Sequence, residues 1–486
     1  MDCCNTGNSP STPLRQRNLA QQHLVIVGGG GAAFAAALKA SSLGAKATII
    51  NAGLLMGGTC VNVGCVPSKT LLRAAEALHR ARQPPRFSGI NTSGRLDDFS
   101  AVIRQKRELV ERLRQTRYAG VIGDDPNISF RRGRGQLIDA HAVSVNGERI
   151  EGDAVLISTG ARPAVPAIPG LEHVAFLTNE SAFELTALPA SLLVVGGRYI
   201  ALECAQLFAR LGSRVTVLQR SARILPDQSP ELTQALTSYL EGEGIRVLTG
   251  VKPVRVAEEA GEVVLEATAG GRREVFRAEQ LLLATGRQPN TDDLGLSTAG
   301  VVVDARGFVG VDETLATSTK GVFAAGDVIG EPMFVYTAAY EGALAAENAL
   351  AGARRRRDYT ALPWVVFTDP QVAGVGLDEA AALAQGLPAE SVTLPLAEVP
   401  RAIAARDTRG FIQLIRDRET DRLLGARVLA PEGGELLMEA ALAIRHGLTV
   451  QSLASAFHPY LTLSEGVKLA ALSFGKDVRK LSCCAA

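Results

Sequence analysis

The chain has 486 residues, of which 47% are hydrophobic and 21% are charged, and its formal net charge is +1. This length suits about three domains, and the near-neutral charge gives no reason to expect nucleic acid or an anionic membrane as partner. No apolar run approaches the ~20 residues of a membrane span, and the N-terminus lacks the basic-then-apolar layout of a signal peptide. We therefore expect a cytoplasmic protein without membrane insertion.

Six of the seven cysteines fall in pairs, and the seventh, Cys204, stands alone. The pairs are Cys3–Cys4, Cys60–Cys65 and Cys483–Cys484. So few cysteines in so long a chain do not form a disulfide scaffold. Residues 1–21 are rich in Ser, Thr, Asn, Gln and Pro, which is typical of a flexible tail. The first pair could bind a soft metal there, or have no role.

A strand over residues 24–27 is predicted to enter a glycine-rich turn and a helix over 35–42. Gly28, Gly30 and Ala33 fit the pattern G-x-G-x-x-A. Gly28 allows the tight turn, Gly30 lets the backbone approach a pyrophosphate, and Ala33 lets the helix pack closely. A strand over 47–50 follows, and Asn51 stands where an acidic residue would normally bind a ribose hydroxyl. One such pattern is weak evidence for a bound dinucleotide.

Cys60 and Cys65 are five residues apart, just ahead of Lys69. Apolar residues then recur at helical spacing, so we expect the cysteines in the first turns of a helix; these residues are Leu71, Leu72, Ala75 and Leu78. An ideal helix separates positions five apart by about 140°, so a bridge between the cysteines would require a distorted first turn, which Gly64 permits. A helix N-terminus also stabilises a thiolate. The alternative is a pair of buried structural cysteines.

The glycine pattern repeats 168 residues later, where Gly196 corresponds to Gly28 and Gln219 to Asn51. A chance duplicate is improbable, so the chain should hold two dinucleotides. Arg198 replaces the middle glycine of the second copy, which departs from the usual approach of backbone to pyrophosphate.

The end of the second copy indicates which nucleotide it binds. Gln219 stands in place of an acidic residue, and Arg220 and Arg223 follow it. An acid would pair with the 2′-hydroxyl of NAD, whereas arginines suit a 2′-phosphate, so we predict NADP. The alternative is that both arginines belong to a solvated loop.

Several further segments end in polar residues. We predict a charged helix over 101–118 and short strands over 131–145 and 149–158 that end at Thr159-Gly160. A strand over 281–284 ends at Thr285-Gly286, and a third ends at Asp327. An aspartate at the carboxyl end of a strand is well placed to bind a polyol or a ribose. After residue 363, strands (364–367, 410–415, 424–429) and helices (435–446, 450–454, 464–474) mix, which predicts an α+β domain.

Together the motifs resemble the pyridine nucleotide–disulfide oxidoreductases. The resemblance rests on the Cys60-x4-Cys65 segment, Lys69, the doubled glycine pattern, and the stretches 284–286 and 324–327, and it covers residue 22 to the C-terminus. It implies an α/β fold with two Rossmann-like domains, for FAD and for NADP, and an α+β dimerisation domain. The predicted divisions are a tail over 1–21, an FAD domain over 22–165 and 291–360, an NADP domain over 166–290, and a dimerisation domain over 361–486.

Carried over residue by residue, the resemblance implies two cofactor sites. FAD would contact Gly28, Gly30, Ala33, Asn51, Thr59, Lys69, Gly135, Thr159, Gly160, Asp327 and Val335. NADPH would contact Gly196, Gly197, Ala201, Gln219, Arg220, Arg223 and Gly286.

The resemblance also assigns the redox groups. Cys65 would face the flavin and Cys60 would be its exposed partner, the two forming a redox-active disulfide. Lys69 would lie near the flavin and pair with Glu203. The chain would form a homodimer in which each C-terminal tail, with Cys483 and Cys484, reaches the active site of the other subunit.

One substitution distinguishes members of the family. Disulfide-reducing members carry His-x-His-Pro-Thr-Leu-Ser-Glu, whereas this chain has Tyr460 at the second histidine and His458 two positions earlier. Thiol–disulfide exchange needs a group that titrates near neutral pH, and a tyrosine with a reference pKa of ~10 is a poor one.

The resemblance therefore implies FAD-containing, NADPH-dependent reduction of Hg(II) to elemental mercury. The metal would pass from the terminal cysteine pair to Cys60 and Cys65, with Tyr199 and Tyr460 beside it. A disulfide reductase of the glutathione or lipoamide type, and a thiol protein that sequesters metal, are the alternatives.

Overall fold

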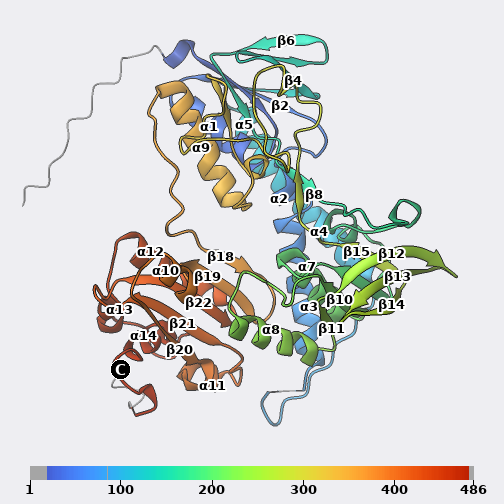
Figure 1. The fold of residues 1–486 in the computed structure, drawn as a ribbon, viewed down its shortest axis with the longest axis vertical. Helices are drawn as coiled ribbons and strands as arrows, with labels where there is room; N and C mark the ends of the chain where they lie inside the picture. Colours follow the sequence, from blue (N-terminus) through green and yellow to red (C-terminus); the bar gives the residue numbers. More distant parts are fainter. Residues whose placement is uncertain (1–18, 85, 481–486) are drawn as a thin grey trace, which may run out of the picture. The chain divides into compact units, whose positions relative to one another are not determined.

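The computed structural model describes residues 19–84 and 86–480, and the chain divides into two compact units (Figure 1). Unit 1 contains residues up to Pro67, 107–162 and 287–357, and unit 2 contains 68–106, 163–286 and the residues from Asp358 onward. Three of these limits lie near the predicted domain boundaries at 165, 290 and 360. Residues 68–106, expected in the FAD domain, group with unit 2. None of the described helices is long and apolar enough to cross a membrane.

Unit 1 is built on a parallel sheet with the strand order β17-β7-β1-β2-β3. The strands are β1 (His23–Val27), β2 (Lys46–Asn51), β3 (Ile128–Arg132), β7 (Ala154–Ile157) and β17 (Val322–Ala324). Near-continuous apolar runs form the three central strands, and nearly all of their residues are buried. That composition is typical of a parallel sheet covered on both faces.

Two helices, α1 (Gly31–Ser42) and α9 (Val335–Ala351), lie side by side over this sheet (Figure 1). They can approach closely because Gly342 has no side chain. A Cβ there would lie only 2.1 Å from the carbonyl oxygen of Ala32. On the other face, a second apolar cluster packs on an antiparallel sheet of β4 (Gly135–Asp139), β5 (Ala142–Val145) and β6 (Glu148–Glu151). A short pair, β8 (Ala161–Pro163) and β16 (Arg287–Pro289), completes the unit.

Unit 2 contains a second parallel sheet with the order β11-β10-β9-β15. Its strands are β9 (Ser191–Val195), β10 (Arg214–Gln219), β11 (Arg246–Thr249) and β15 (Gln280–Leu283). Helices α6 (Asn179–Ala182), α7 (Tyr199–Leu211) and α8 (Pro230–Gly242) accompany it. An antiparallel sheet of β12 (Lys252–Glu259), β13 (Glu262–Ala269) and β14 (Arg272–Ala278) packs on it through a shared apolar cluster.

The C-terminal part of unit 2 is an antiparallel sheet with the order β18-β19-β22-β21-β20. Its strands are β18 (Trp364–Val366), β19 (Gln371–Gly376), β20 (Ala389–Pro395), β21 (Phe411–Asp417) and β22 (Leu423–Ala430). The helices are α10 (Glu379–Ala384), α11 (Pro400–Ala404), α12 (Leu437–Arg445), α13 (Val450–Ser455) and α14 (Glu465–Leu472). The predicted α+β character of this region is confirmed.

The cysteine segment differs from the single helix expected. Cys60 lies in a short helix, α2 (Gly58–Asn62), and Cys65 is the first residue of a second helix, α3 (Cys65–Arg82). The break falls at Val63 and Gly64, where a side chain on Gly64 would meet the carbonyl oxygen of Thr59 at 2.9 Å. The distortion that Gly64 was expected to permit is therefore a complete interruption of the helix.

The predicted charged helix is also interrupted. It spans Phe99–Arg114 as α4, continues as a π-helical turn, η2 (Gln115–Ala119), and ends in α5 (Gly120–Gly123). A π-helical turn accommodates one more residue than an α-helical turn and often occurs at a functional site. Here it carries Tyr118.

Candidate active site

The first glycine turn of unit 1 is shaped by close backbone approaches. Gly28 has φ +128°, and a Cβ there would lie 2.1 Å from the carbonyl oxygen of Ser158. Gly29 packs on the side chain of Asn51, and Gly30 is the N-cap of α1. Only glycine satisfies these constraints at positions 28 and 29, and the N-terminus of α1 is left as a site for a phosphate group.

The other residues expected at this site surround the same turn or belong to the same unit. Ala33 is fully buried in α1, Gly135 is buried in β4, and Val335, at the start of α9, lies against Gly31. Thr159 donates to the carbonyl oxygen of Asn290 at 2.7 Å. The glycine turn and these contacts form a cradle that suits a dinucleotide.

Asp327 follows β17 at the carboxyl edge of the unit 1 sheet, as the sequence predicted. Its carboxylate lies 3.5 Å from the guanidinium of Arg287. Burial raises the pKa of Asp327, and the positive charge of Arg287 opposes that shift. The buried backbone nitrogen of Gly326 donates to Glu341 at 2.7 Å, which fixes the turn that carries the aspartate.

The cysteine segment packs directly on the first glycine turn. A Cβ on Gly58 would lie 2.7 Å from the Cα of Gly30, and the backbone nitrogen of Gly57 donates to Gly29 at 2.8 Å. Cys60 is half-buried and Cys65 is exposed. In this structure of the chain alone, Cys65 is therefore more exposed to solvent than Cys60. The sequence-based expectation was that Cys60 would be the exposed cysteine. Thr59 is the second residue of the same short helix.

Tyr118 is a site residue that the sequence reasoning missed. Its ring lies 3.2 Å from the position of a Cβ on Gly57 and packs edge-to-face on Phe34, with 4.9 Å between ring centroids. Burial raises the pKa of Tyr118, and negative charge on Cys60 and Cys65 raises it further. The phenol therefore lies within electrostatic reach of both cysteines and stays protonated. A lone tyrosine at the end of a charged helix was the available signal.

In unit 2, Lys69 pairs with Glu203 as expected, with 2.8 Å between Nζ and Oε2. Glu203 is nearly buried and its other oxygen accepts a hydrogen bond from the backbone nitrogen of Phe367 at 3.0 Å. The Lys69 ammonium also lies 4.3 Å from the centre of the Phe367 ring. The carboxylate of Glu203 and the ring of Phe367 thus hold the ammonium group of Lys69 in place.

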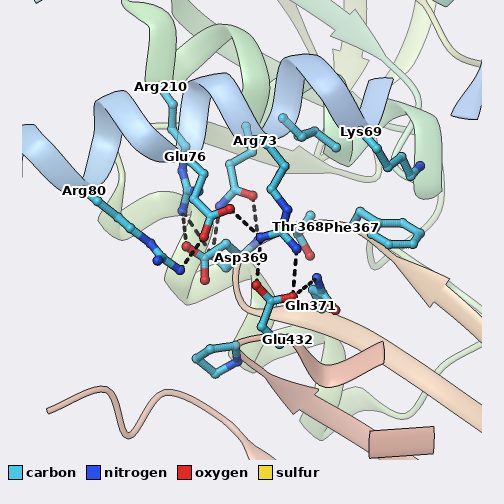
Figure 2. Close-up of a pocket in the computed structure, with 13 residues that line it drawn as sticks. Lys69, Arg73, Glu76, Arg80, Arg210, Phe367, Thr368, Asp369, Gln371 and Glu432 are labelled. Carbon is cyan, nitrogen blue, oxygen red and sulfur yellow. Dashed lines mark hydrogen bonds and ion pairs between the residues drawn. The ribbon is translucent and has the colours of Figure 1, made fainter. Parts of the chain in front are cut away.

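Lys69 lies at the edge of a cavity of about 220 Å³, and Figure 2 shows the charged groups that line it. Arg73 bonds both carboxylate oxygens of Glu432 at 2.7 and 2.8 Å and reaches Glu76 at 2.7 Å. Arg210 bonds Asp369 at 3.0 Å. Each of these cations has a carboxylate partner, so the cavity presents balanced charge.

The second glycine turn, in unit 2, has nearly the backbone of the first. Gly196 has φ +129°, and a Cβ there would lie 2.3 Å from the carbonyl oxygen of Ala284. Gly197 packs on Gln219, and Ala201 is fully buried in α7. Arg198 caps α7 through its backbone while its exposed guanidinium pairs with both oxygens of Asp227. The side chain therefore points to a loop carboxylate, and the glycine turn keeps its shape.

The residues expected to select NADP lie beyond β10. Gln219 is buried and donates to the carbonyl oxygen of Arg223 at 3.3 Å. Arg220 is exposed, and Arg223 donates to backbone carbonyl oxygens of its own loop, at Pro226 and Gln228. Gly286 has φ +118° and follows β15, the strand that pairs with β9.

The two tyrosines named from the sequence lie on different elements of unit 2. Tyr199 begins α7 and stacks on Trp364, with 5.9 Å between ring centroids. Tyr460 is half exposed in the segment between α13 and α14. The side chain of His458 is buried, and its Nε2 lies 2.8 Å from Glu439. Cys3, Cys4, Cys483 and Cys484 fall outside the described residues, and within those residues no group of three or more His, Cys, Asp or Glu could hold a metal ion.

The comparisons with known proteins agree with this geometry. The family described as pyridine nucleotide-disulphide oxidoreductase matches residues 22–342, and its dimerisation domain matches 362–471. A mercuric reductase of Lysinibacillus sphaericus is 44% identical over 463 residues, covering 95% of this chain and 84% of that protein. One of Streptomyces lividans is 46% identical over 469 residues, covering 95% and 98%.

Two solved structures have a similar fold. The HOCl-induced flavoprotein disulfide reductase RclA from Escherichia coli, as its Cu(II) complex, superposes with a TM-score of 0.84 at 29% identity. LpdA from Mycobacterium tuberculosis superposes with a TM-score of 0.84 at 27% identity. Each match covers 94% of this chain and 100% of the other.

Proposed function

Because the chain belongs to the pyridine nucleotide–disulphide oxidoreductase family, we propose that it is a flavoenzyme that uses NADPH to reduce Hg(II) to elemental mercury. The observation that carries the proposal is the packing of the cysteine segment on the first glycine turn, where Gly58 touches Gly30. This contact brings a thiol pair to the edge of a dinucleotide cradle.

FAD fits the cradle of unit 1. Gly28 and Gly29 let the turn pack on Ser158 and Asn51, and beside Gly30 the nearest atom to a Cβ would be 3.9 Å away. The N-terminus of α1 suits a pyrophosphate, and Asp327 suits a ribose or a polyol. When bound, FAD would supply a carrier that takes a hydride from NADPH and returns the two electrons to the cysteines or the metal. Lys69, fixed by Glu203, would add positive charge near that carrier.

NADPH is the proposed reductant because Gln219 replaces the acid that would recognise NAD. Arg220 is exposed at the end of the same strand and can pair with a 2′-phosphate. Since NADPH is supplied inside cells, we expect the reaction to take place in the cytoplasm.

Cys60 and Cys65 would hold the metal as thiolates, which favour soft ions. Two Hg–S bonds to these cysteines form as two bonds to carrier thiols break, and the released thiolates take up protons. Hg(II) then gains the two electrons of one NADPH, and both Hg–S bonds break to leave elemental mercury and two cysteine thiolates. NADPH becomes NADP⁺, and one proton is released to solvent. Tyr118, which stays protonated, can donate a hydrogen bond to a thiolate throughout.

We propose a metal and not a disulfide as the substrate because of Tyr460 and His458. A disulfide substrate needs a proton for its leaving thiol, and Tyr460 occupies the position of the acid in disulfide-reducing relatives. His458 is buried against Glu439, which suits a structural role. Low-molecular-weight disulfide reduction remains the second candidate, since the solved relative RclA is a flavoprotein disulfide reductase.

We further propose a homodimer, formed through the dimerisation domain, in which Cys483 and Cys484 of one subunit deliver metal to Cys60 and Cys65 of the other. The double variant Cys483→Ala/Cys484→Ala should keep its flavin and its dimeric state. It should lose most turnover of thiol-bound Hg(II) and less turnover of a halide complex. Mixed dimers with the intact tail and the intact Cys60 on the same chain should be nearly inactive, and wild-type activity in them would exclude the shared site.

The proposal is tested by NADPH oxidation in the presence of Hg(II), oxidised glutathione or oxidised lipoamide, with purified holoenzyme and excess thiol. We expect turnover with Hg(II) and negligible turnover with either disulfide. Rapid disulfide reduction with slow metal reduction would support the second candidate and place the acid at His458.

A further inference from the structure

Three residues form a cross-strand row in the C-terminal sheet of unit 2. Trp364 on β18 pairs with Gly374 on β19, and Gly374 pairs with Arg427 on β22. A Cβ on Gly374 would lie 2.5 Å from the indole of Trp364 and 3.0 Å from Cδ of Arg427. Because Gly374 has no side chain, the indole and the arginine can meet across β19, the strand between them.

Arg427 is a fixed neighbour for that indole. Its guanidinium donates to the carbonyl oxygens of Val375 at 3.0 Å, Ala426 at 2.9 Å and Gly376 at 3.2 Å, and it lies 5.8 Å from the Trp364 ring centre. Burial lowers the pKa of Arg427, and the charges of Asp378 and Tyr199 oppose that shift. The arginine is thus held by backbone and contributes a cation–π contact.

The indole in turn contacts the helix that begins at the second glycine turn. Tyr199, the first residue of α7, stacks on Trp364 with 10° between the ring planes. One helical turn later, Glu203 accepts a hydrogen bond from the backbone of Phe367, just after β18. The first turn of α7 is therefore attached to β18 at two points.

We propose that Trp364 and Arg427 are positioning residues for the pyridine nucleotide. Held over Gly374, they fix Tyr199 and with it the first turn of α7, the segment to which the nucleotide binds in the proposed function on which this inference rests. A nucleotide that binds there alters the surroundings of Trp364. Loss of the indole leaves Tyr199 without its stacking partner and weakens nucleotide binding about three- to tenfold.

Trp364 is the only tryptophan of the chain, so its emission reports on the stack directly. The holoenzyme is titrated with NADP⁺, which does not absorb where tryptophan emits, so energy transfer to the nucleotide cannot cause a change. We expect a saturable change of emission with the Kd that calorimetry gives for NADP⁺. An unchanged emission at saturation would contradict the contact between the stack and the nucleotide site.

Variants separate positioning from general packing. Trp364→Leu should raise the Kd for NADP⁺ and the KM for NADPH three- to tenfold while kcat and flavin content stay within about twofold, and Trp364→Phe should restore most of the affinity. Arg427→Met should raise the Kd in the same direction. The matched control is Phe474→Leu, which removes a ring lying 4.3 Å from Arg416 in the same region and should leave the Kd unchanged.

Equal Kd values for Trp364→Leu and the wild type, or an equal loss in Phe474→Leu, would overturn the inference. A wild-type holoenzyme that binds neither NADP⁺ nor NADPH would instead contradict the proposed function, and the positioning role with it. The two failures are therefore distinguishable from calorimetry of the unmodified protein.

Discussion

The two glycine turns share a backbone but differ in what packs on them. Gly28 and Gly196 have φ values of +128° and +129°, and each approaches a strand-end carbonyl oxygen so closely that a Cβ would lie at 2.1 or 2.3 Å. At the first turn, Gly58 of the cysteine segment packs beside the middle glycine, Gly30. At the second, the middle position is Arg198, which pairs with Asp227 on the surface.

This difference fits the roles that we propose for the two turns, a resident flavin at the first and an exchangeable nucleotide at the second. A turn bordered by the cysteine segment, as at Gly30, suits a group that reacts with neighbouring thiols. A turn whose rim is exposed, as at Arg198, suits a nucleotide that must leave after each cycle. The same backbone therefore supports two roles, and side chains beyond the turn assign them.

The largest expected effect comes from matched substitutions in the two turns. Gly28→Ala should yield a protein without bound flavin and without any activity, because a methyl group would overlap the carbonyl oxygen of Ser158. Gly196→Ala should keep the flavin and lose reduction by NADPH. The measurements are the flavin absorption of the purified protein and the rate of flavin reduction, with circular dichroism as a check of folding. Flavin loss in Gly196→Ala alone would reverse the assignment.

The next largest effect is expected for Cys65→Ala, which should lose nearly all of one reaction step but not the other. Metal turnover should disappear, because a single thiolate cannot hold Hg(II) beside the first turn, while flavin reduction by NADPH continues. Cys204→Ala is the control, since burial raises the pKa of Cys204 and keeps it an unreactive thiol. Normal Hg(II) turnover in Cys65→Ala would exclude the cysteine segment as the metal site.

A moderate effect is expected for substitutions at the last residue of β10 in unit 2, compared with the last residue of β2 in unit 1. Gln219→Glu should lower kcat/KM for NADPH about 10- to 100-fold, because a carboxylate repels the 2′-phosphate. This loss corresponds to ~1.4–2.8 kcal/mol of binding free energy in the transition state. Asn51→Asp, the equivalent change in unit 1, should leave the preference for NADPH over NADH intact. Steady-state kinetics with both nucleotides measures this, and an equal loss of preference in the two variants would show that Gln219 does not select the cofactor.

The smallest effect concerns the tyrosines. Tyr118→Phe should slow Hg(II) turnover about tenfold, the value of one hydrogen bond to a charged group, and leave flavin reduction unchanged. Tyr199→Phe keeps the ring that stacks on Trp364 and should have little effect on either rate. Stopped-flow kinetics of the two half-reactions distinguishes them, and a larger loss of metal turnover in Tyr199→Phe would restore the role predicted for that residue.

The sequence predicted the elements that depend on local pattern. Gly28 and Gly196 were found because a glycine turn between a strand and a helix has a fixed spacing, and the pairing of Lys69 with Glu203 came from the family resemblance. The helix break at Val63 and the π-helical turn that carries Tyr118 were missed, because neither changes the apolar periodicity on which the prediction relied. The row of Trp364, Gly374 and Arg427 depends on strand order and register, which no local pattern encodes.

In the proposed function, electrons from NADPH reduce the metal and not another acceptor. It is tested most directly by measuring elemental mercury vapour released per NADPH oxidised, with purified holoenzyme, thiol-bound Hg(II) and no oxygen. We expect one mercury atom per NADPH, and no vapour from Cys65→Ala. NADPH oxidation without vapour, or loss of Hg(II) from solution without NADPH oxidation, would contradict it.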